Sequence, residues 1–166
     1  MQLKAKFKET FESFMSHRKS LKTISVASAT EVGKPNSAVK MLIDIVSPNL
    51  LYLLDYKFTQ TYANVVKNPH LSVSFMDDDS FTGYRLTGVA SVMHDGREFD
   101  EVKKAWEKKL IAYEADRIIK RIQGGYSAHE AENSLPKDFV IVKFVAQEAS
   151  VIKPDRVFRA IHGEDI

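Results

Sequence analysis

The stretch GKPNSAVKMLIDIV at residues 33–46 combines a tight turn with the β-strand that follows it. Gly33 and Pro35 mark the turn, because glycine and proline supply backbone angles that interrupt regular structure. Over residues 37–46 the side chains alternate in character, as they do in a strand with one face in a core. The alternation places Lys40 and Asp44 on one face, and on the other face it places Val39, Met41, Ile43 and Ile45.

The regions on either side of this strand supply the remaining elements. Period-two alternation predicts strands, and apolar residues spaced by three and four predict helices. Asn68 and Pro69 end the short middle helix, because proline disfavours helical backbone in the residue before it. The expected strands cover residues 21–29, 37–46, 50–54, 71–75, 84–93 and 139–152, and the expected helices cover 3–19, 59–67 and 97–122, with a polar tail after Pro154.

This order of elements predicts a mostly β chain of the α+β class: a six-stranded antiparallel barrel with peripheral helices. Closely spaced strands are typical of a closed or half-closed antiparallel barrel, whereas a parallel doubly wound sheet needs strands that alternate with helices. Gly88 inside the fifth strand predicts a bulge or a close approach of another backbone. We expect one domain over residues 1–166, with an N-terminal helix at about 3–19 and a helical insertion at about 97–135.

Composition argues against several classes of partner. The 166 residues carry a net charge of +2 without a basic run, which leaves no electrostatic footprint for nucleic acid. The apolar runs are far shorter than the roughly 20 residues that cross a bilayer. No cysteine is present, and lysines occupy the N-terminal segment where a signal peptide needs apolar residues. We therefore expect a cytoplasmic protein that binds neither nucleic acid nor membrane.

The common catalytic and metal-binding motifs are missing from the sequence. It contains no glycine-rich phosphate loop, no zinc-protease helix motif and no serine-hydrolase elbow. The five histidines lack ligand spacing, and the three aspartates at 77–79 are more typical of a solvated hairpin, because adjacent strand-end side chains diverge. The sequence therefore predicts no metal site and leaves the catalytic residue unknown.

Five segments follow one another in a recognisable order: GKPNSAV at 33–39, LYLLD at 51–55, QTYANVVKNP at 60–69, LSVSF at 71–75 and YRLTGVA at 84–90. This order resembles the pyridoxamine-phosphate-oxidase-like, FMN-binding split-barrel family, with its Gly-x-Pro turn, its helix ending in Asn-Pro and its Arg-hydrophobic-x-Gly strand. The resemblance covers roughly residues 20–93, with a looser match in the last strand. It implies a split β-barrel flavoprotein, an oxidoreductase acting on a small molecule, and a homodimer with FMN at its interface.

The resemblance places the cofactor against the second strand, the third strand and the short helix. Backbone groups of residues 38–41 and 55–58 would contact the flavin ring, and the first N–H groups of the helix would hold the phosphate. Thr59, which also fits the N-cap position, and Thr61 would add hydroxyl donors, while Lys40 and Lys57 could add positive charge. The implied cofactor-binding set is Ala38, Val39, Lys40, Met41, Asp55, Tyr56, Lys57, Phe58, Thr59, Gln60, Thr61 and Arg85.

Two positions depart from the family pattern. Gln60 stands where members that bind FMN tightly have a basic residue, and Ala38 stands where the pyridoxamine-phosphate oxidases themselves have an arginine. These departures argue against oxidation of pyridoxamine phosphate itself. They leave open a haem-binding or haem-degrading protein with His162 as the candidate iron ligand, a relative that uses a deazaflavin, and a non-catalytic flavin-binding module.

Some side chains fit two roles. Lys40 interrupts an apolar strand and fits either a solvent-facing position or a ligand contact. The aromatic residues that fit either a structural role or the substrate side of the site are Tyr56, Phe58 and Tyr84. The candidates for contacts across the dimer interface are Phe75, Met76 and Arg85.

Overall fold

The computed structural model describes residues 8–13, 16, 23–46, 49–77, 79–123 and 139–161. Residues 1–93 and 140–166 form one compact unit, and residues 94–139 form another. Along the chain the elements are β1 (Thr23–Ala29), β2 (Pro35–Val46), β3 (Leu50–Asp55), α2 (Gln60–Lys67), β4 (His70–Asp77), β5 (Thr82–Met93), α3 (Arg97–Gln123), β6 (Val140–Lys153) and β7 (Arg156–Ile161).

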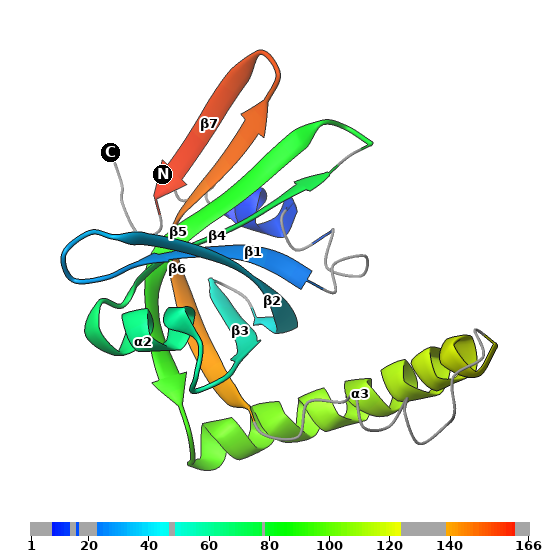
Figure 1. The fold of residues 1–166 in the computed structure, drawn as a ribbon. Helices are drawn as coiled ribbons and strands as arrows, with labels where there is room; N and C mark the ends of the chain where they lie inside the picture. The colour runs from blue at the N-terminus through cyan, green and yellow to red at the C-terminus, as the bar shows by residue number, and fades with distance from the viewer. Residues whose placement is uncertain are drawn as a thin grey trace. The chain divides into compact units, whose positions relative to one another are not determined.

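Six of these strands close into a barrel (Figure 1). They follow the order β3-β2-β1-β4-β5-β6, and every neighbouring pair is antiparallel. The ring closes because β3 also pairs with β6, from Leu50 opposite Val145 to Asp55 opposite Val140. The predicted class, a six-stranded antiparallel split β-barrel with peripheral helices, is confirmed.

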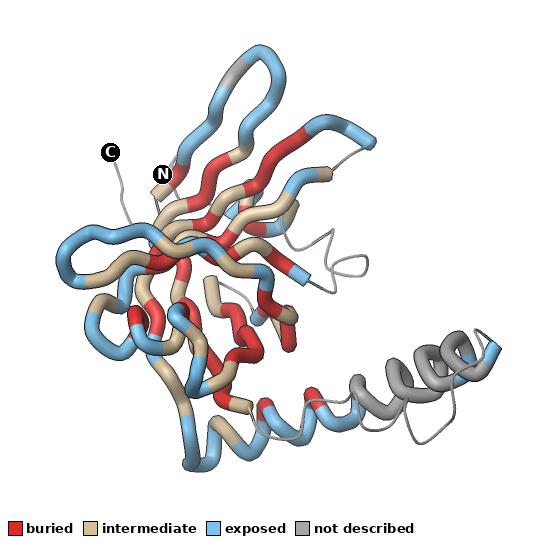
Figure 2. The backbone as a smooth tube through the Cα atoms, viewed as in Figure 1, coloured by how far each residue is buried: buried red, intermediate tan, exposed pale blue. Residues whose placement is uncertain are grey.

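Figure 2 shows buried positions along the strands of the barrel, and the apolar side chains at these positions form one core. Ile24 and Val26 of β1 and Phe144 of β6 are almost completely buried. Val65 of α2 and Phe11 of the helical segment 8–13 belong to the same buried cluster, so both helices contribute to this core. Full burial of one such side chain contributes about 1.5–3 kcal/mol, which makes the shared core the main source of stability for the barrel.

A bulge corrects the predicted faces of β2. The pairing of β2 with β3 shifts register between Leu42 and Asp44, so that Leu42 and Ile43, although adjacent in sequence, are both buried. The regular alternation predicted from the sequence places Val39 on the buried face and Lys40 opposite to it. This prediction was wrong: Val39 is 69% exposed, whereas Lys40 is 9% exposed.

The segment after Pro154, predicted to be a polar tail, also differs from its prediction. Residues Arg156–Ile161 form β7, which pairs with the second half of β6 from Glu148 opposite Ile161 to Lys153 opposite Arg156. The 14-residue β6 therefore serves both the barrel and a hairpin that extends beyond it. A strand of six residues that includes two arginines carries too little apolar alternation to be found from sequence.

The helices match the prediction where the structure describes them. The N-terminal helix expected at 3–19 is helical at residues 8–13 and 16, and α3 covers the whole of the helix expected at 97–122. The rest of the N-terminal span, and residues 124–135 of the expected insertion, lie outside the described residues. In the part of the chain described here, no helix has the length and apolar character that a membrane crossing requires.

Gly88 allows two strands to approach closely. The pairing of β5 with β6 shifts register between Thr87 and Gly88, which makes Gln147 the extra residue on β6. A Cβ atom on Gly88 would lie 2.1 Å from the backbone oxygen of Val145, well inside van der Waals contact. The bulge and the close backbone approach predicted from this glycine are therefore both present.

We expect Gly88→Ala to destabilise the barrel by about 3 kcal/mol, because the neighbouring backbone must move to admit the methyl group. Urea denaturation measures the change in the free energy of unfolding. Gly83→Ala is the matched control on the same strand, since its Cβ would meet Ile152 Cβ at 3.4 Å, an ordinary contact. Equal stabilities of the two variants would contradict the steric explanation.

Candidate functional site

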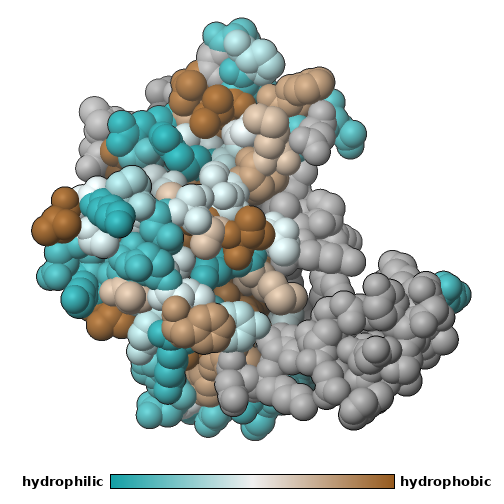
Figure 3. All heavy atoms as spheres, viewed as in Figure 1, coloured by the Kyte–Doolittle hydropathy of each residue, from teal (hydrophilic) through white to brown (hydrophobic). Residues whose placement is uncertain are grey.

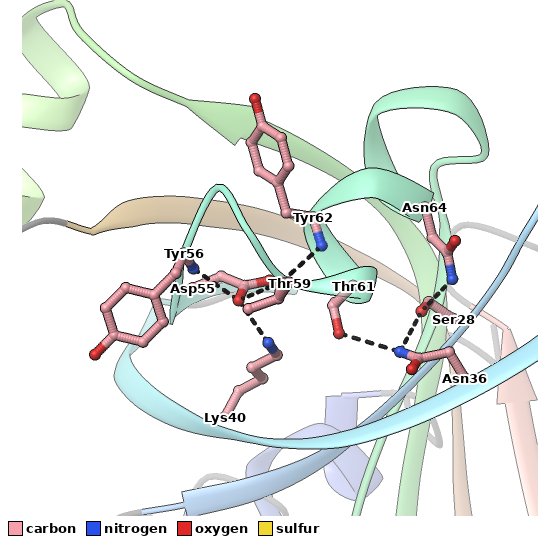
Figure 4. A network of polar contacts seen from close by, with 9 residues as sticks. All are labelled: Ser28, Asn36, Lys40, Asp55, Tyr56, Thr59, Thr61, Tyr62 and Asn64. Carbon is pink, nitrogen blue, oxygen red and sulfur yellow. Dashed lines mark hydrogen bonds and ion pairs between the residues drawn. The ribbon is translucent and has the colours of Figure 1, made fainter.

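A buried carboxylate at the end of β3 is the centre of a polar network (Figure 4). Asp55 is 1% exposed, and its Oδ1 atom accepts three hydrogen bonds. The donors are Lys40 Nζ at 2.5 Å, the backbone N–H of Tyr56 at 2.8 Å and Thr59 Oγ1 at 2.8 Å. The Lys40 contact is also an ion pair in which both side chains are buried. This arrangement fixes the start of the loop that leads from β3 to α2.

Thr59 connects this network to α2. Its backbone is extended, with φ −84° and ψ 153°, and its Oγ1 accepts the N–H of Tyr62 at 3.1 Å, which makes Thr59 the N-cap predicted from sequence. The same hydroxyl donates to Asp55, so both roles of the oxygen are used within the protein. The first turn of α2 contains no acidic residue, so Asp55 provides a negative charge at this end of the helix.

A second group of polar side chains joins α2 to β1 and β2. Asn36 Nδ2 donates to Ser28 Oγ at 3.2 Å and to Thr61 Oγ1 at 3.3 Å. Asn64 Nδ2 also donates to Ser28 Oγ, at 2.9 Å, and Gln60 Nε2 donates to Asn64 Oδ1 at 2.8 Å. Ser28 and Asn36 are opposite each other in the β1–β2 pairing, and Thr61 and Asn64 are almost fully buried. These bonds hold α2 against the strands over most of its length.

A pocket of about 310 Å³ lies where this second group reaches the surface. Its lining contains one cationic side chain, Lys34, together with amide and hydroxyl groups, and contains no carboxylate among the described residues. The surrounding surface over the β1–β2 turn and α2 is largely hydrophilic (Figure 3). Such a lining suits an anionic or strongly hydrogen-bonding group. The lining residues are Thr30, Lys34, Pro35, Asn36, Gln60 and Asn64.

Two aromatic rings lie in the loop between β3 and α2. Tyr56 and Phe58 stack with ring centroids 5.3 Å apart and an angle of 14° between their planes, and Phe58 is 87% exposed. Burial and, to a smaller extent, the negative charge of Asp55 raise the pKa of Tyr56. Its phenol is therefore protonated at neutral pH and can act as a hydrogen-bond donor. The pair offers a flat apolar surface beside the polar network.

The structure brings together part of the site set implied by the resemblance. Lys40, Asp55, Tyr56 and Thr59 form one network, and Gln60 and Thr61 belong to the second group on α2. The ammonium group of Lys40 is buried against Asp55, which excludes the solvent-facing role, and its contact with a ligand stays a prediction. The solvent-facing alternative was wrong because the β2 bulge separates Lys40 from the alternation of the later residues.

The remaining members of the set lie around this network. Ala38 is opposite Val26 and half-buried, whereas Val39 projects from the other face of β2. Met41 is half-buried on β2, and Lys57 and Phe58 are exposed in the β3–α2 loop. These placements leave the implied cofactor contacts as predictions.

Arg85 lies on β5, apart from the residues of the network. It is opposite Ser74 of β4 and Ser150 of β6, on the face away from its core neighbours Tyr84 and Leu86. Its Nε atom is buried and has no hydrogen-bond partner among the described residues. A buried donor without an acceptor is costly, so this face of β5 is suited to a further hydrogen-bond acceptor.

The aromatic and interface candidates divide between core and surface. Tyr84 stacks on Phe75 with ring centroids 4.9 Å apart, and its hydroxyl lies 3.0 Å from Ser13 Oγ in a hydrogen bond. Both rings pack in or against the barrel core, which favours the structural role for Tyr84. Met76 is 61% exposed, and His162, the candidate haem ligand, lies outside the described residues.

Sequence reasoning missed Ser28, Asn36 and Asn64. The only available signal was spacing: Gln60 and Asn64 are four residues apart and therefore share one face of a helix. Ser28 continues the inward alternation of Ile24 and Val26, but a serine at the end of a strand is also typical of a turn. Their meeting depends on how α2 docks on the barrel, which the sequence alone does not specify.

We expect Lys40→Met to destabilise the fold by about 3–5 kcal/mol, because it leaves the Asp55 carboxylate buried without its cation. In Lys40→Met/Asp55→Asn the side-chain oxygen still accepts from Tyr56 and Thr59, and no unpaired charge remains. The double variant should therefore be more stable than Lys40→Met alone when both are unfolded in urea. Purely additive effects of the two substitutions would show that the charges do not interact.

The family model described as pyridoxamine 5′-phosphate oxidase matches residues 7–153. No curated protein matches the sequence. One similar solved structure is a Clostridium acetobutylicum protein related to general stress protein 26 of B. subtilis, of the pyridoxinephosphate oxidase family. It is 19% identical with a TM-score of 0.65, over 93% of this chain and 95% of that one.

Two further structures share the fold. A pyridoxamine 5′-phosphate oxidase-related, FMN binding protein from Nostoc punctiforme is 11% identical with a TM-score of 0.59, over 92% of this chain and 87% of that one. A heme binding protein from Mycobacterium smegmatis is 15% identical with a TM-score of 0.63, over 93% of this chain and 57% of that one. At these identities the structural likeness establishes the fold alone. The match of the family model over residues 7–153 shows that the chain belongs to the pyridoxamine 5′-phosphate oxidase family.

Proposed function

We propose that this chain is an FMN-binding flavoprotein that acts as an oxidoreductase on a small molecule. The observation that carries the proposal is the pocket between the β1–β2 turn and α2, lined by Lys34 and by amide and hydroxyl groups. A phosphate group needs several donors and tolerates no nearby unpaired carboxylate, and this lining meets both conditions. Membership of a family with an FMN-binding structural neighbour supports the choice of flavin.

The residues present fit the two ends of FMN. Gln60 and the free N–H groups at the start of α2 are suited to the phosphate, as the sequence implied for the 59–61 segment. The exposed ring of Phe58, stacked on Tyr56, and the backbone of residues 38–41 are suited to the planar ring system. When bound, the flavin supplies the electron-transfer chemistry, and the chain orients it.

The dimer is part of the same proposal. Met76 and Arg85 lie on the outward face of the β4–β5 pair, where an apolar side chain is exposed and a buried Nε atom has no partner in the described part of the chain. A second copy of the chain could cover the side chain of Met76 and supply a hydrogen-bond acceptor for Arg85 Nε.

The cytoplasmic location expected from the sequence also stays a prediction.

Haem is the second candidate ligand. The Mycobacterium smegmatis neighbour with the same fold is a heme binding protein, and Gln60 leaves the helix end without the cation expected for a tightly held flavin phosphate. Visible absorption of the purified protein, repeated after addition of excess FMN and removal of free ligand, separates the candidates. We expect the two flavin bands to be retained. A Soret band would establish haem, and the absence of both chromophores would contradict the proposal.

Turnover separates an oxidoreductase from a non-catalytic flavin-binding module. Reduction of the bound flavin by a nicotinamide donor, followed at the visible flavin band, would support the enzyme. A flavin that binds but is reduced by no donor would favour the binding module.

We expect Lys34→Glu to weaken FMN binding about tenfold, because it places a negative charge in the lining of the proposed phosphate pocket. Quenching of flavin fluorescence during titration measures the Kd. Lys67→Glu is the matched control, since Lys67 lies in the last turn of α2 and outside the pocket lining. Equal Kd values for the two variants would exclude this pocket as the phosphate site.

A further inference from the structure

The N-terminal end of α2 already has a carboxylate of the protein beside it. Asp55 Oδ1 lies 2.8 Å from Thr59 Oγ1, and Thr59 caps the helix through the N–H of Tyr62. The start of a helix carries a partial positive charge that attracts anions. Because Asp55 lies next to this charge and shares its cap, a phosphate that approaches α2 meets a helix end whose attraction is already reduced.

Lys40 adds no net attraction either. Its ammonium group is buried and lies 2.5 Å from Asp55 Oδ1, so the positive charge is neutralised within the protein. If Asp55 were neutral, Lys40 and the helix end would both attract an anion. If Lys40 were neutral, the unpaired carboxylate would repel one. The two members of the pair therefore have opposite effects on a charged ligand.

The two oxygens of Asp55 differ, which allows the charge to be removed cleanly. Oδ1 accepts all three hydrogen bonds, whereas Oδ2 is buried and has no partner among the described residues. In Asp55→Asn the amide oxygen can keep the three bonds while the amide nitrogen takes the place of Oδ2. The substitution thus removes the charge of the carboxylate and keeps an acceptor for the three donors, while the Lys40 ammonium group loses its counter-charge.

We infer that Asp55 is a specificity-determining residue that weakens recognition of the ligand's phosphate, so that the site discriminates little between FMN and riboflavin. This inference rests on the proposed function, because it assumes that a flavin phosphate binds beside the start of α2.

The test compares two flavins that differ only by the phosphate. Kd values for FMN and riboflavin are measured by fluorescence titration for the wild-type chain, Asp55→Asn and Lys40→Met, with folding checked by circular dichroism. The ratio of the riboflavin Kd to the FMN Kd isolates the contribution of the phosphate. We expect Asp55→Asn to raise this ratio roughly tenfold and Lys40→Met to lower it.

Glu148→Gln is the matched control. Glu148 forms an ion pair with Arg159 in the β6–β7 hairpin, so its loss removes a carboxylate from a salt bridge without touching α2. The ratio should stay at its wild-type value in this variant. A merely structural role of Asp55 and Lys40 would weaken both flavins equally in each variant.

The outcomes separate the inference from the proposed function. Ratios that stay unchanged, or that move in the same direction in both variants, overturn the inference while flavin binding stands. Failure of every folded variant and of the wild-type chain to bind either flavin overturns the proposed function, and the inference with it.

Discussion

The pairing of β3 with β6 is the constraint on which the rest of the structure depends. It joins residues that are about 90 positions apart in sequence and turns an open sheet into a ring. The closed ring gives the core a complete wall, and it fixes Asp55 at the end of β3 opposite Val140. Since Asp55 anchors the start of α2, the geometry of the candidate site follows from the closure of the barrel.

Burial of the Lys40–Asp55 pair in the barrel carries a cost in the free energy of folding. Two buried charges lose their hydration, and their attraction offsets that loss only with good geometry and further hydrogen bonds. Here Tyr56 and Thr59 supply two such bonds to the same oxygen, and the second oxygen receives none among the described residues. An apolar pair would fill the space at lower cost, so the network is better explained by what it orients than by what it stabilises.

The fold could be predicted from sequence further than the site could. Strand alternation, the Asn68-Pro69 stop and the cap at Thr59 are local signals, and each is present in the structure. The faces of β2 could not be predicted, because a bulge at Leu42 changes the alternation without leaving a mark in residue type. The resemblance predicted which segments contain the candidate site. It did not predict that Lys40 pairs with Asp55, because this contact joins β2 to β3 and residue spacing within one strand carries no information about it.

The position of β7 has a consequence for behaviour in concentrated solution. In the described part of the chain, β7 is the strand with an unpaired outer edge. The strand at the other end of the sheet, β3, pairs with β6. Open edges invite strand-to-strand aggregation, and charged side chains on a short edge strand oppose it. β7 is six residues long and carries the exposed Arg159 beside the exposed Val157 and Phe158. Protection of this open edge against strand-to-strand aggregation therefore depends on a charged side chain in a hairpin outside the closed barrel.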